Sequence, residues 1–202
     1  MSPTQQERTE ATTVALVEAA RDLFAKDGFA ATSLDAVVAK AGVTKGALYH
    51  HFSGKRDLFA AVFAAEQQSL NEVVAAAYAA HQDPWDAFAA GCRAFVAACQ
   101  EPGVQRIFLL DAQPALGWER IRQIESGTME MMVRGIERAV EAGRIAPRDA
   151  PQLAHFLFGA ICESAMVAAR APDQRAALRQ AEEELAAVLG SLEVRRDDRR
   201  RA

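Results

Sequence analysis

The chain has 202 residues, of which half are hydrophobic and a quarter are charged, and its formal net charge is −4 at pH 7. A chain of this length can bury a substantial core in one or two domains. No apolar run approaches the roughly 18 residues of a membrane span, and the first ten residues lack the apolar core of a signal peptide. We therefore expect a soluble cytoplasmic protein with no membrane partner.

The spacing of apolar residues predicts an all-α protein. Apolar residues recur at intervals of three and four, whereas the alternation typical of strands is absent over any useful length. We expect nine helices. The first three are predicted at about 12–27, 33–41 and 44–51, a long fourth from Ser53 to about Ala80, a fifth after Asp83, a short sixth at 104–110, a seventh at 118–142, and the last two at about 151–170 and 172–192.

The two short helices predicted at 33–41 and 44–51 lie on either side of a glycine. Thr32 is expected to cap the first pattern, and Thr44 is a good N-cap for the second. Gly42 lies between them and allows the left-handed backbone of a tight turn. Two short helices joined in this way form a helix-turn-helix, whose second helix can enter a DNA major groove.

The residues of this motif carry a family resemblance. The run AGVTKGALYHHF, from Ala41 to Phe52, followed by Lys55 and the pair Leu58–Phe59, resembles the DNA-binding signature of the TetR family of bacterial transcriptional regulators. Beyond about Glu66 the resemblance is one of helix layout and length. It implies a helix-turn-helix DNA-binding domain at 1–58, a ligand-binding and dimerisation domain at 59–192, and a charged tail at 193–202 that is expected to be disordered.

The resemblance also implies DNA contacts. Thr44, Lys45 and Gly46 are expected to meet the major groove. Phosphates are expected to be met by the others, which are Thr32 or Ser33 together with Tyr49, His50 and Lys55. The alternatives are partial packing of Tyr49 and simple solvation of Lys55. The expected DNA-binding residues are Thr32, Ser33, Thr44, Lys45, Gly46, Tyr49, His50 and Lys55.

Charge supports this interpretation only locally. The segment 1–58 contains all four lysines, and the acidic excess lies in the rest of the chain. We therefore expect strongly salt-dependent DNA binding. Residues 1–11 are expected to be a mobile arm, with a DNA contact by Arg8 as the alternative. Solvation alone explains the arginines of the tail, with a nonspecific DNA contact as the alternative.

A small-molecule pocket is implied among the fourth to eighth helices. Its apolar and aromatic lining predicts an apolar or aromatic effector, although such residues also serve as core. Glu163 is expected to pair with Arg106 or Arg134, with a cationic ligand as the alternative. The expected lining is Trp85, Phe88, Phe95, Phe108, Trp118, Met129, Met132, Phe158, Cys162, Glu163 and Met166.

The last two helices have more apolar surface than one neighbour can cover, which indicates self-association. The resemblance implies a four-helix interface in a homodimer. The expected interface residues are Phe156, Ile161, Val167, Leu178, Leu185, Val188, Leu189 and Leu192.

No catalytic or metal-binding motif emerges, so we expect no enzyme, no cofactor and no metal. The cysteines Cys92, Cys99 and Cys162 are expected to be reduced core residues, and the isolated His155 a core histidine. The sequence thus predicts a ligand-responsive repressor of a palindromic operator in double-stranded DNA. The alternatives are an activator and a small-molecule binding protein with a vestigial helix-turn-helix.

Overall fold

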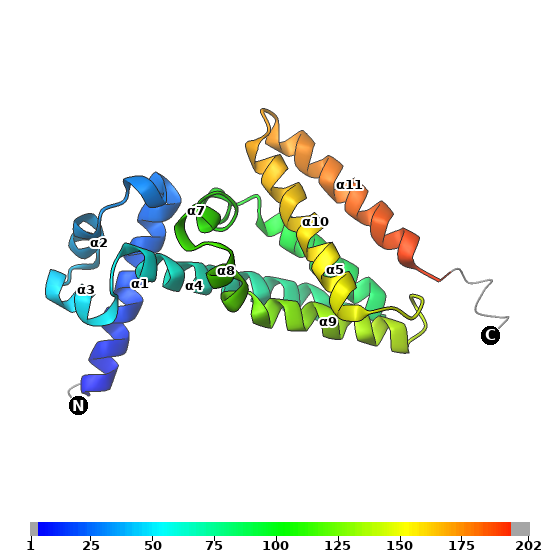
Figure 1. The fold of residues 1–202 in the computed structure, drawn as a ribbon, viewed down its shortest axis with the longest axis horizontal. Helices are drawn as coiled ribbons and strands as arrows, with labels where there is room; N and C mark the ends of the chain where they lie inside the picture. The colour runs from blue at the N-terminus through cyan, green and yellow to red at the C-terminus, as the bar shows by residue number, and fades with distance from the viewer. Residues whose placement is uncertain (1–3, 195–202) are drawn as a thin grey trace. The chain divides into compact units, whose positions relative to one another are not determined.

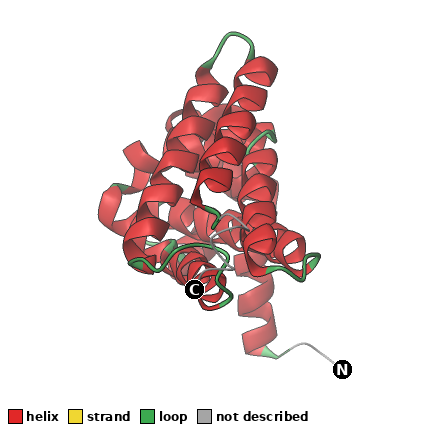
Figure 2. Cartoon of the chain, turned by 90° about the vertical axis from the view of Figure 1, so that its right-hand side faces the viewer, coloured by secondary structure: helices red, strands yellow, loops and turns green. Residues whose placement is uncertain are grey.

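The fold is known from a computed structural model that describes residues 4–194. These residues are almost entirely helical, and their one strand-like feature is an isolated bridge between Ile145 and Glu193 (Figure 2). The prediction of an all-α protein is confirmed. The chain forms two compact units: unit 1 contains the residues up to 67 and 101–123, and unit 2 contains 68–100 and the residues from 124 on.

Unit 1 combines the N-terminal helices with a later segment of the chain. In Figure 1, α2 and α3 lie beside α1. Its elements are α1 (Gln5–Ala31), α2 (Leu34–Ala41), α3 (Lys45–His51), the first part of α4 (Lys55–Ala79), α6 (Pro102–Val104), the π-helix η1 (Gln105–Asp111), α7 (Ala112–Leu116) and α8 (Trp118–Ile124), which extends one residue past the unit.

Helix α1 is longer than predicted at both ends. The Thr4 hydroxyl accepts a hydrogen bond from the Glu7 amide at 3.2 Å, and the Glu7 carboxylate accepts one from the Thr4 amide at 2.6 Å. This capping box starts the helix at Gln5, so the expectation of a mobile arm is wrong for residues 4–11. Gly28, with φ of 80°, interrupts the helix near its end.

The core of unit 1 is aromatic. The rings of Phe24 and Phe29 each pack edge-on against Phe59 with centroids 5.0 Å apart, and Phe63 stacks on Phe108 at 4.9 Å. Phe24 and Phe59 are fully buried. Burial of each such ring stabilises the fold by about 1.5–3 kcal/mol.

The segment 101–123 is part of this unit through specific polar contacts. Asp111 accepts a hydrogen bond from the Phe29 amide at 2.7 Å and pairs with Arg106 at 3.1 Å. The Arg106 guanidinium lies so close to Gly28 that a Cβ atom there would overlap it. Packing therefore groups 101–123 with the N-terminal helices, whereas the functional boundary expected after residue 58 stays a prediction.

Unit 2 is a bundle of longer helices. Its elements are the second part of α4, α5 (Pro84–Ala98), α9 (Ser126–Glu141), α10 (Ala150–Arg170) and α11 (Gln174–Leu192). Asp83 caps α5 by accepting from the amides of Trp85 and Asp86, as predicted. Helices α10 and α11 pack against each other, and Figure 1 shows them side by side in yellow and orange.

Two expectations about the helices need correction. The single helix predicted at 118–142 is broken at Glu125 into α8 and α9, where the weak helix formers Ser126 and Gly127 follow, so the described residues hold more than nine helical elements. In addition, α10 is long and apolar enough, with a mean hydropathy of 1.3, to meet the criterion for a membrane span. Core helices of soluble proteins meet the same criterion.

Candidate nucleic-acid interface and pocket

Local sequence positions α3 by its caps. Gly42 adopts a left-handed conformation with φ of 67°, and the Thr44 hydroxyl accepts from the Ala47 amide at 3.1 Å. Leu48 and Phe52 are buried and anchor the helix to unit 1. The opposite side is exposed and carries Thr44, Lys45, Gly46, Tyr49 and His50.

The exposed face therefore brings together five of the eight residues expected to contact DNA. Tyr49 is 52% exposed, so about half of it is accessible to a nucleic acid and the rest is covered by the protein. A Cβ atom at Gly46 would meet only the Thr44 hydroxyl, at 3.9 Å, so a nucleic acid could approach this backbone closely. Contact with DNA by these residues stays a prediction.

Lys45 is held by a neighbouring carboxylate. Its ammonium group lies 2.7 Å from Asp35 on α2, and both side chains are more than half exposed. The hydrogen bond with Asp35, aided by the attraction of the two charges, raises the pKa of Lys45. An exposed ion pair of this kind contributes little stability, so Lys45 can exchange Asp35 for a phosphate or a base at small cost.

The other three residues have different surroundings. Thr32 is 4% exposed, and its hydroxyl donates to the Gly28 carbonyl at 2.8 Å, so the expectation that Thr32 caps α2 is wrong. Ser33, one residue later, is exposed and caps α2 by accepting from the Ala36 amide.

Lys55 has a structural role that the sequence did not indicate. Its ammonium group donates to the carbonyls of Ala30 at 3.1 Å and Thr32 at 2.8 Å, and it lies 4.7 Å from the ring centre of Phe29. These contacts fasten the start of α4 to the end of α1. A phosphate contact by Lys55 stays a prediction.

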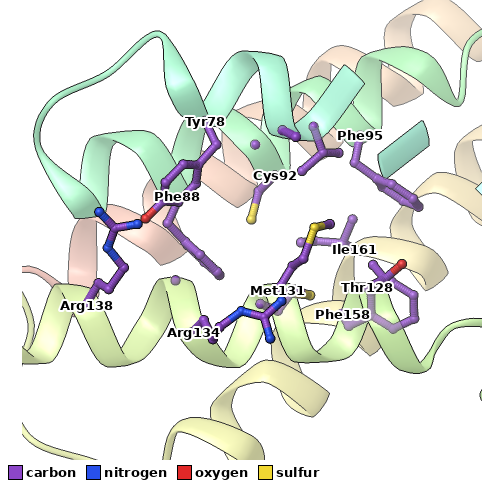
Figure 3. Close-up of a pocket in the computed structure, with 15 residues that line it drawn as sticks. Tyr78, Phe88, Cys92, Phe95, Thr128, Met131, Arg134, Arg138, Phe158 and Ile161 are labelled. Carbon is purple, nitrogen blue, oxygen red and sulfur yellow. The ribbon is translucent and has the colours of Figure 1, made fainter. Parts of the chain in front are cut away.

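Unit 2 contains a pocket of about 270 Å³, bounded by α4, α5, α9 and α10 (Figure 3). Most of its lining is apolar, as expected for a small-molecule site. The lining residues are Val74, Ala75, Tyr78, Phe88, Gly91, Cys92, Phe95, Thr128, Met131, Met132, Arg134, Gly135, Arg138, Phe158 and Ile161.

Four of the predicted lining residues, Phe88, Phe95, Met132 and Phe158, line this pocket. Trp85 lies behind it, stacked on Phe88 with centroids 5.2 Å apart, and its indole donates to the Leu189 carbonyl. The pocket does not include Met129, Cys162 or Met166.

Three further expectations fail because the residues lie elsewhere. Phe108 belongs to the core of unit 1, and Trp118 is 61% exposed beneath the Arg122 guanidinium. Glu163 is on the exposed side of α10, and neither predicted arginine pairs with it. Arg106 pairs with Asp111 and Arg134 with Glu130.

Sequence reasoning missed the polar part of the pocket, which consists of Tyr78, Thr128, Arg134 and Arg138. The two arginines are one turn apart on α9, a spacing that places them on one helix face beside Met131. The four-residue spacing of the two arginines is the sequence signal from which they could have been predicted. The Thr128 hydroxyl donates to the Asn71 side chain at 2.8 Å.

Two of the three cysteines are buried in the core of unit 2. Burial raises the pKa of the Cys92 thiol to about 12 and that of Cys99 also to about 12, so both are protonated at neutral pH. His155, expected in the core, is exposed on α10. Among the described residues, no group of three or more His, Cys, Asp or Glu side chains could hold a metal ion.

The residues expected at a dimer interface divide into two sets. Phe156, Val167 and Val188 are 68%, 59% and 41% exposed, which leaves them available to a partner. Leu185 and Leu192 are half-buried. Three others are buried within the subunit and their assignment to the interface is wrong: Ile161, Leu178 and Leu189.

Glu66 is 7% exposed and its carboxylate lies 2.6 Å from Arg21 on α1. The pair joins α1 to α4 inside unit 1.

Comparison with known proteins supports the helix-turn-helix interpretation. Residues 16–62 match the model of bacterial regulatory proteins of the tetR family, and 85–192 match that of the tetracyclin repressor-like C-terminal domain. The chain is 27% identical to the Transposon Tn10 TetC protein of Escherichia coli over 77% of this chain and 79% of that protein. It is 41% identical to the HTH-type transcriptional regulator SrpR of Pseudomonas putida, over 30% of this chain and 29% of the relative.

Solved structures agree over nearly the whole chain. A TetR-family transcriptional regulator from Pectobacterium atrosepticum is 34% identical with a TM-score of 0.85, covering 96% of this chain and 99% of that one. FadR from Bacillus subtilis, solved in complex with stearoyl-CoA, is 17% identical with a TM-score of 0.71, covering 85% and 96%. The second likeness shows the fold alone.

Proposed function

Because this chain belongs to the TetR family of transcriptional regulators and carries its helix-turn-helix DNA-binding domain, we propose that it is a homodimeric repressor of a palindromic operator, released by a small apolar effector. The observation that carries this proposal is the exposed face of α3. Thr44, Lys45 and Gly46 stand at the N-terminal end of that helix, where reading helices meet base edges.

The dimer is supported by the apolar residues left exposed on α10 and α11. Phe156 and Val167 lie on one side of α10, eleven positions apart, close to three helical turns. A large exposed phenyl ring on a helix is typical of an interface. Two copies related by a twofold axis present two α3 helices to the two halves of a palindrome.

The response to an effector is supported by the pocket and by α4. Helix α4 lines the pocket with Val74, Ala75 and Tyr78, and its first residues belong to unit 1. Effector binding that alters α4 would lower operator affinity as a coupling free energy between the two sites. A regulator of this kind works in the cytoplasm, where the chromosome is.

The test begins by selecting bound sequences from a random pool of DNA duplexes at low salt. Lys45→Ala and Tyr49→Ala should each weaken binding to the selected duplex by about 1–3 kcal/mol, because they remove contacts from α3. Lys26→Ala, at an exposed lysine on α1, is the matched control and should retain affinity.

Wild-type affinity in both α3 variants would show that another surface reads the DNA. If no duplex is selected even at low salt, a small-molecule binding protein with a vestigial helix-turn-helix becomes the better explanation. Transcript levels of the neighbouring genes after deletion separate repressor from activator, because loss of a repressor raises them.

A further inference from the structure

The pocket of unit 2 has a polar end and an apolar end. Figure 3 shows Arg138 and Tyr78 at one end, with Arg134 on the side of α9 next along the pocket. Phe95 and Phe158 lie at the other end together with Thr128, whose hydroxyl donates to Asn71. The Arg138 guanidinium lies 5.8 Å from the centre of the Tyr78 ring. A ligand that fills this pocket therefore meets two chemically different surroundings.

The charge at the polar end has one sign. Among the fifteen described lining residues, two are arginines and none is acidic. The carboxylate that pairs with Arg134, that of Glu130, is outside the lining and lies 3.4 Å from it in an exposed pair. Such a pair is weak, so Arg134 can exchange Glu130 for a better-placed anion.

A buried hydroxyl lies at the same end. The Tyr78 hydroxyl oxygen is shielded from solvent and has no hydrogen-bond partner among the described residues. A buried polar atom without a hydrogen-bond partner lowers the stability of the folded protein by about 1–3 kcal/mol. A ligand that supplies an acceptor atom there removes that cost.

We infer that the effector of this pocket is an amphipathic monocarboxylic acid, whose carboxylate accepts from Tyr78 and pairs with Arg138 and Arg134 while its apolar body lies between Phe95 and Phe158. Guanidinium groups favour carboxylates because their planar N–H donors match two oxygens. This inference rests on the proposed function and refines it by naming the chemical class of the effector.

The dimensions of the pocket limit the size of that acid. A volume of about 270 Å³ lies just below the range of roughly 300–1,000 Å³ for small-molecule sites. The apolar end accepts a single ring or a medium-length chain, and the absence of further basic residues in the lining disfavours polyanions.

Matched probes test the inference. Calorimetry compares 4-phenylbutanoate, 4-phenylbutan-1-ol and 4-phenylbutylamine, which share a body and differ in the head group, together with straight-chain acids from hexanoate to dodecanoate. The best acid should bind at least about ten-fold more tightly than the alcohol of the same body, and the amine more weakly than either. The inference is overturned if the alcohol or the amine binds as tightly as its acid, or if no acid binds at up to about 1 mM.

Variants locate the binding site. The double variant Arg134→Gln/Arg138→Gln should abolish the preference for acid over alcohol while retaining alcohol binding, and Tyr78→Phe should weaken acid binding by about five-fold. Arg93→Gln, at an exposed arginine on α5 that does not line the pocket, is the control and should keep the preference. A preference that survives in the double variant would place the acid elsewhere.

The outcome separates this inference from the proposed function. Binding of the selected DNA duplex is measured with and without the best acid. If DNA binds and no acid does, the effector class is wrong and the regulator stands. If acid binds with the expected preference and DNA affinity is unchanged, the pocket chemistry stands and the release of operator by this ligand fails.

Discussion

At the scale of single residues, the charge of the proposed DNA-reading face is balanced within the protein itself. Lys45 on α3 pairs with Asp35 on α2, and Lys40 pairs with Asp22 at 3.1 Å. Both pairs are exposed, so neither contributes much to the folded state. The first pair lies on the proposed DNA-binding face, where the carboxylate would repel phosphates and hold the one lysine of α3.

The substitution Asp35→Asn should therefore tighten DNA binding by about three- to ten-fold at moderate salt, because it frees Lys45 and removes a negative charge close to the DNA. The slope of log affinity against log salt should steepen by about one. Asp22→Asn removes the equivalent carboxylate from the Lys40 pair and should have a smaller effect. Weaker binding of the Asp35 variant in a titration over several salt concentrations would mean that Asp35 itself reads the DNA.

At the scale of elements, Arg144 connects the ends of three helices of unit 2. It follows α9, pairs with the α5 cap residue Asp83, and lies 3.3 Å from Glu193 at the end of α11. Its backbone carbonyl also accepts from the Val194 amide at 2.9 Å. Its side chain is 15% exposed, so these contacts are partly shielded from water.

The pH dependence of stability should reveal this connection. Burial opposes the charged form of Asp83, but the amide hydrogen bonds at the start of α5 and the Arg144 guanidinium outweigh it, so the pKa of Asp83 is lowered from its usual 3.8. A lowered pKa stabilises the fold above the unfolded value, and this contribution is lost as pH falls through the folded value.

Asp83→Asn should accordingly reduce the free energy of unfolding by about 1 kcal/mol at pH 7, since asparagine still caps the helix but carries no charge for Arg144. The difference from the wild type should shrink toward zero below about pH 4. Urea unfolding at a series of pH values measures this difference in the free energy of unfolding. Asp86, which lies 3.8 Å from Arg144, gives the control: Asp86→Asn should lower the free energy of unfolding by less. If the difference between the Asp83 variant and the wild type persists at acid pH, the electrostatic explanation is contradicted.

Elements were predictable where the signal is local. Thr44 and Asp83 cap their helices as the sequence indicates, because an N-cap needs a side chain and an amide two or three residues away. The same local rule, had it been applied to Thr4 and Glu7, would have found the start of α1. The break at Glu125 lies within a continuous apolar pattern, and the weak helix formers Ser126 and Gly127 are its only local marker.

The pocket was predictable only in its apolar part. Phe88, Phe95 and Phe158 point inward as aromatic residues on amphipathic helices usually do. Which aromatic residue lines a cavity and which lies behind it depends on the packing of several helices, so Trp85 was misplaced. The lining arginines Arg134 and Arg138 are solvent-exposed, and no hydrophobic period reveals them.

At the scale of the whole molecule, the exposed apolar residues of α10 bear on assembly. Phe156 is 68% exposed, more than any other large apolar residue among those described. The substitution Phe156→Glu should shift the homodimer toward monomers, because it places a charge at the centre of the proposed interface. DNA affinity should fall with it, since two reading helices bind a palindrome more tightly than one.

Sedimentation and a DNA titration measure both effects, and helix content by circular dichroism checks that the variant folds. Ala97→Glu introduces the same side chain at an exposed position of α5 and should leave both properties unchanged. A Phe156 variant that sediments as the wild type does would remove α10 from the interface.

The interleaving of the chain within unit 1 has a consequence for protein engineering. The family model of the DNA-binding part matches residues 16–62, which invites chimaeras joined once, near residue 67. Such a graft would separate Phe63 from Phe108 and the Phe29 amide from Asp111, leaving an apolar face and a polar group without their native counterparts. Transfer of the DNA-reading unit to another sensor therefore requires two grafted segments, the N-terminal helices together with 101–123.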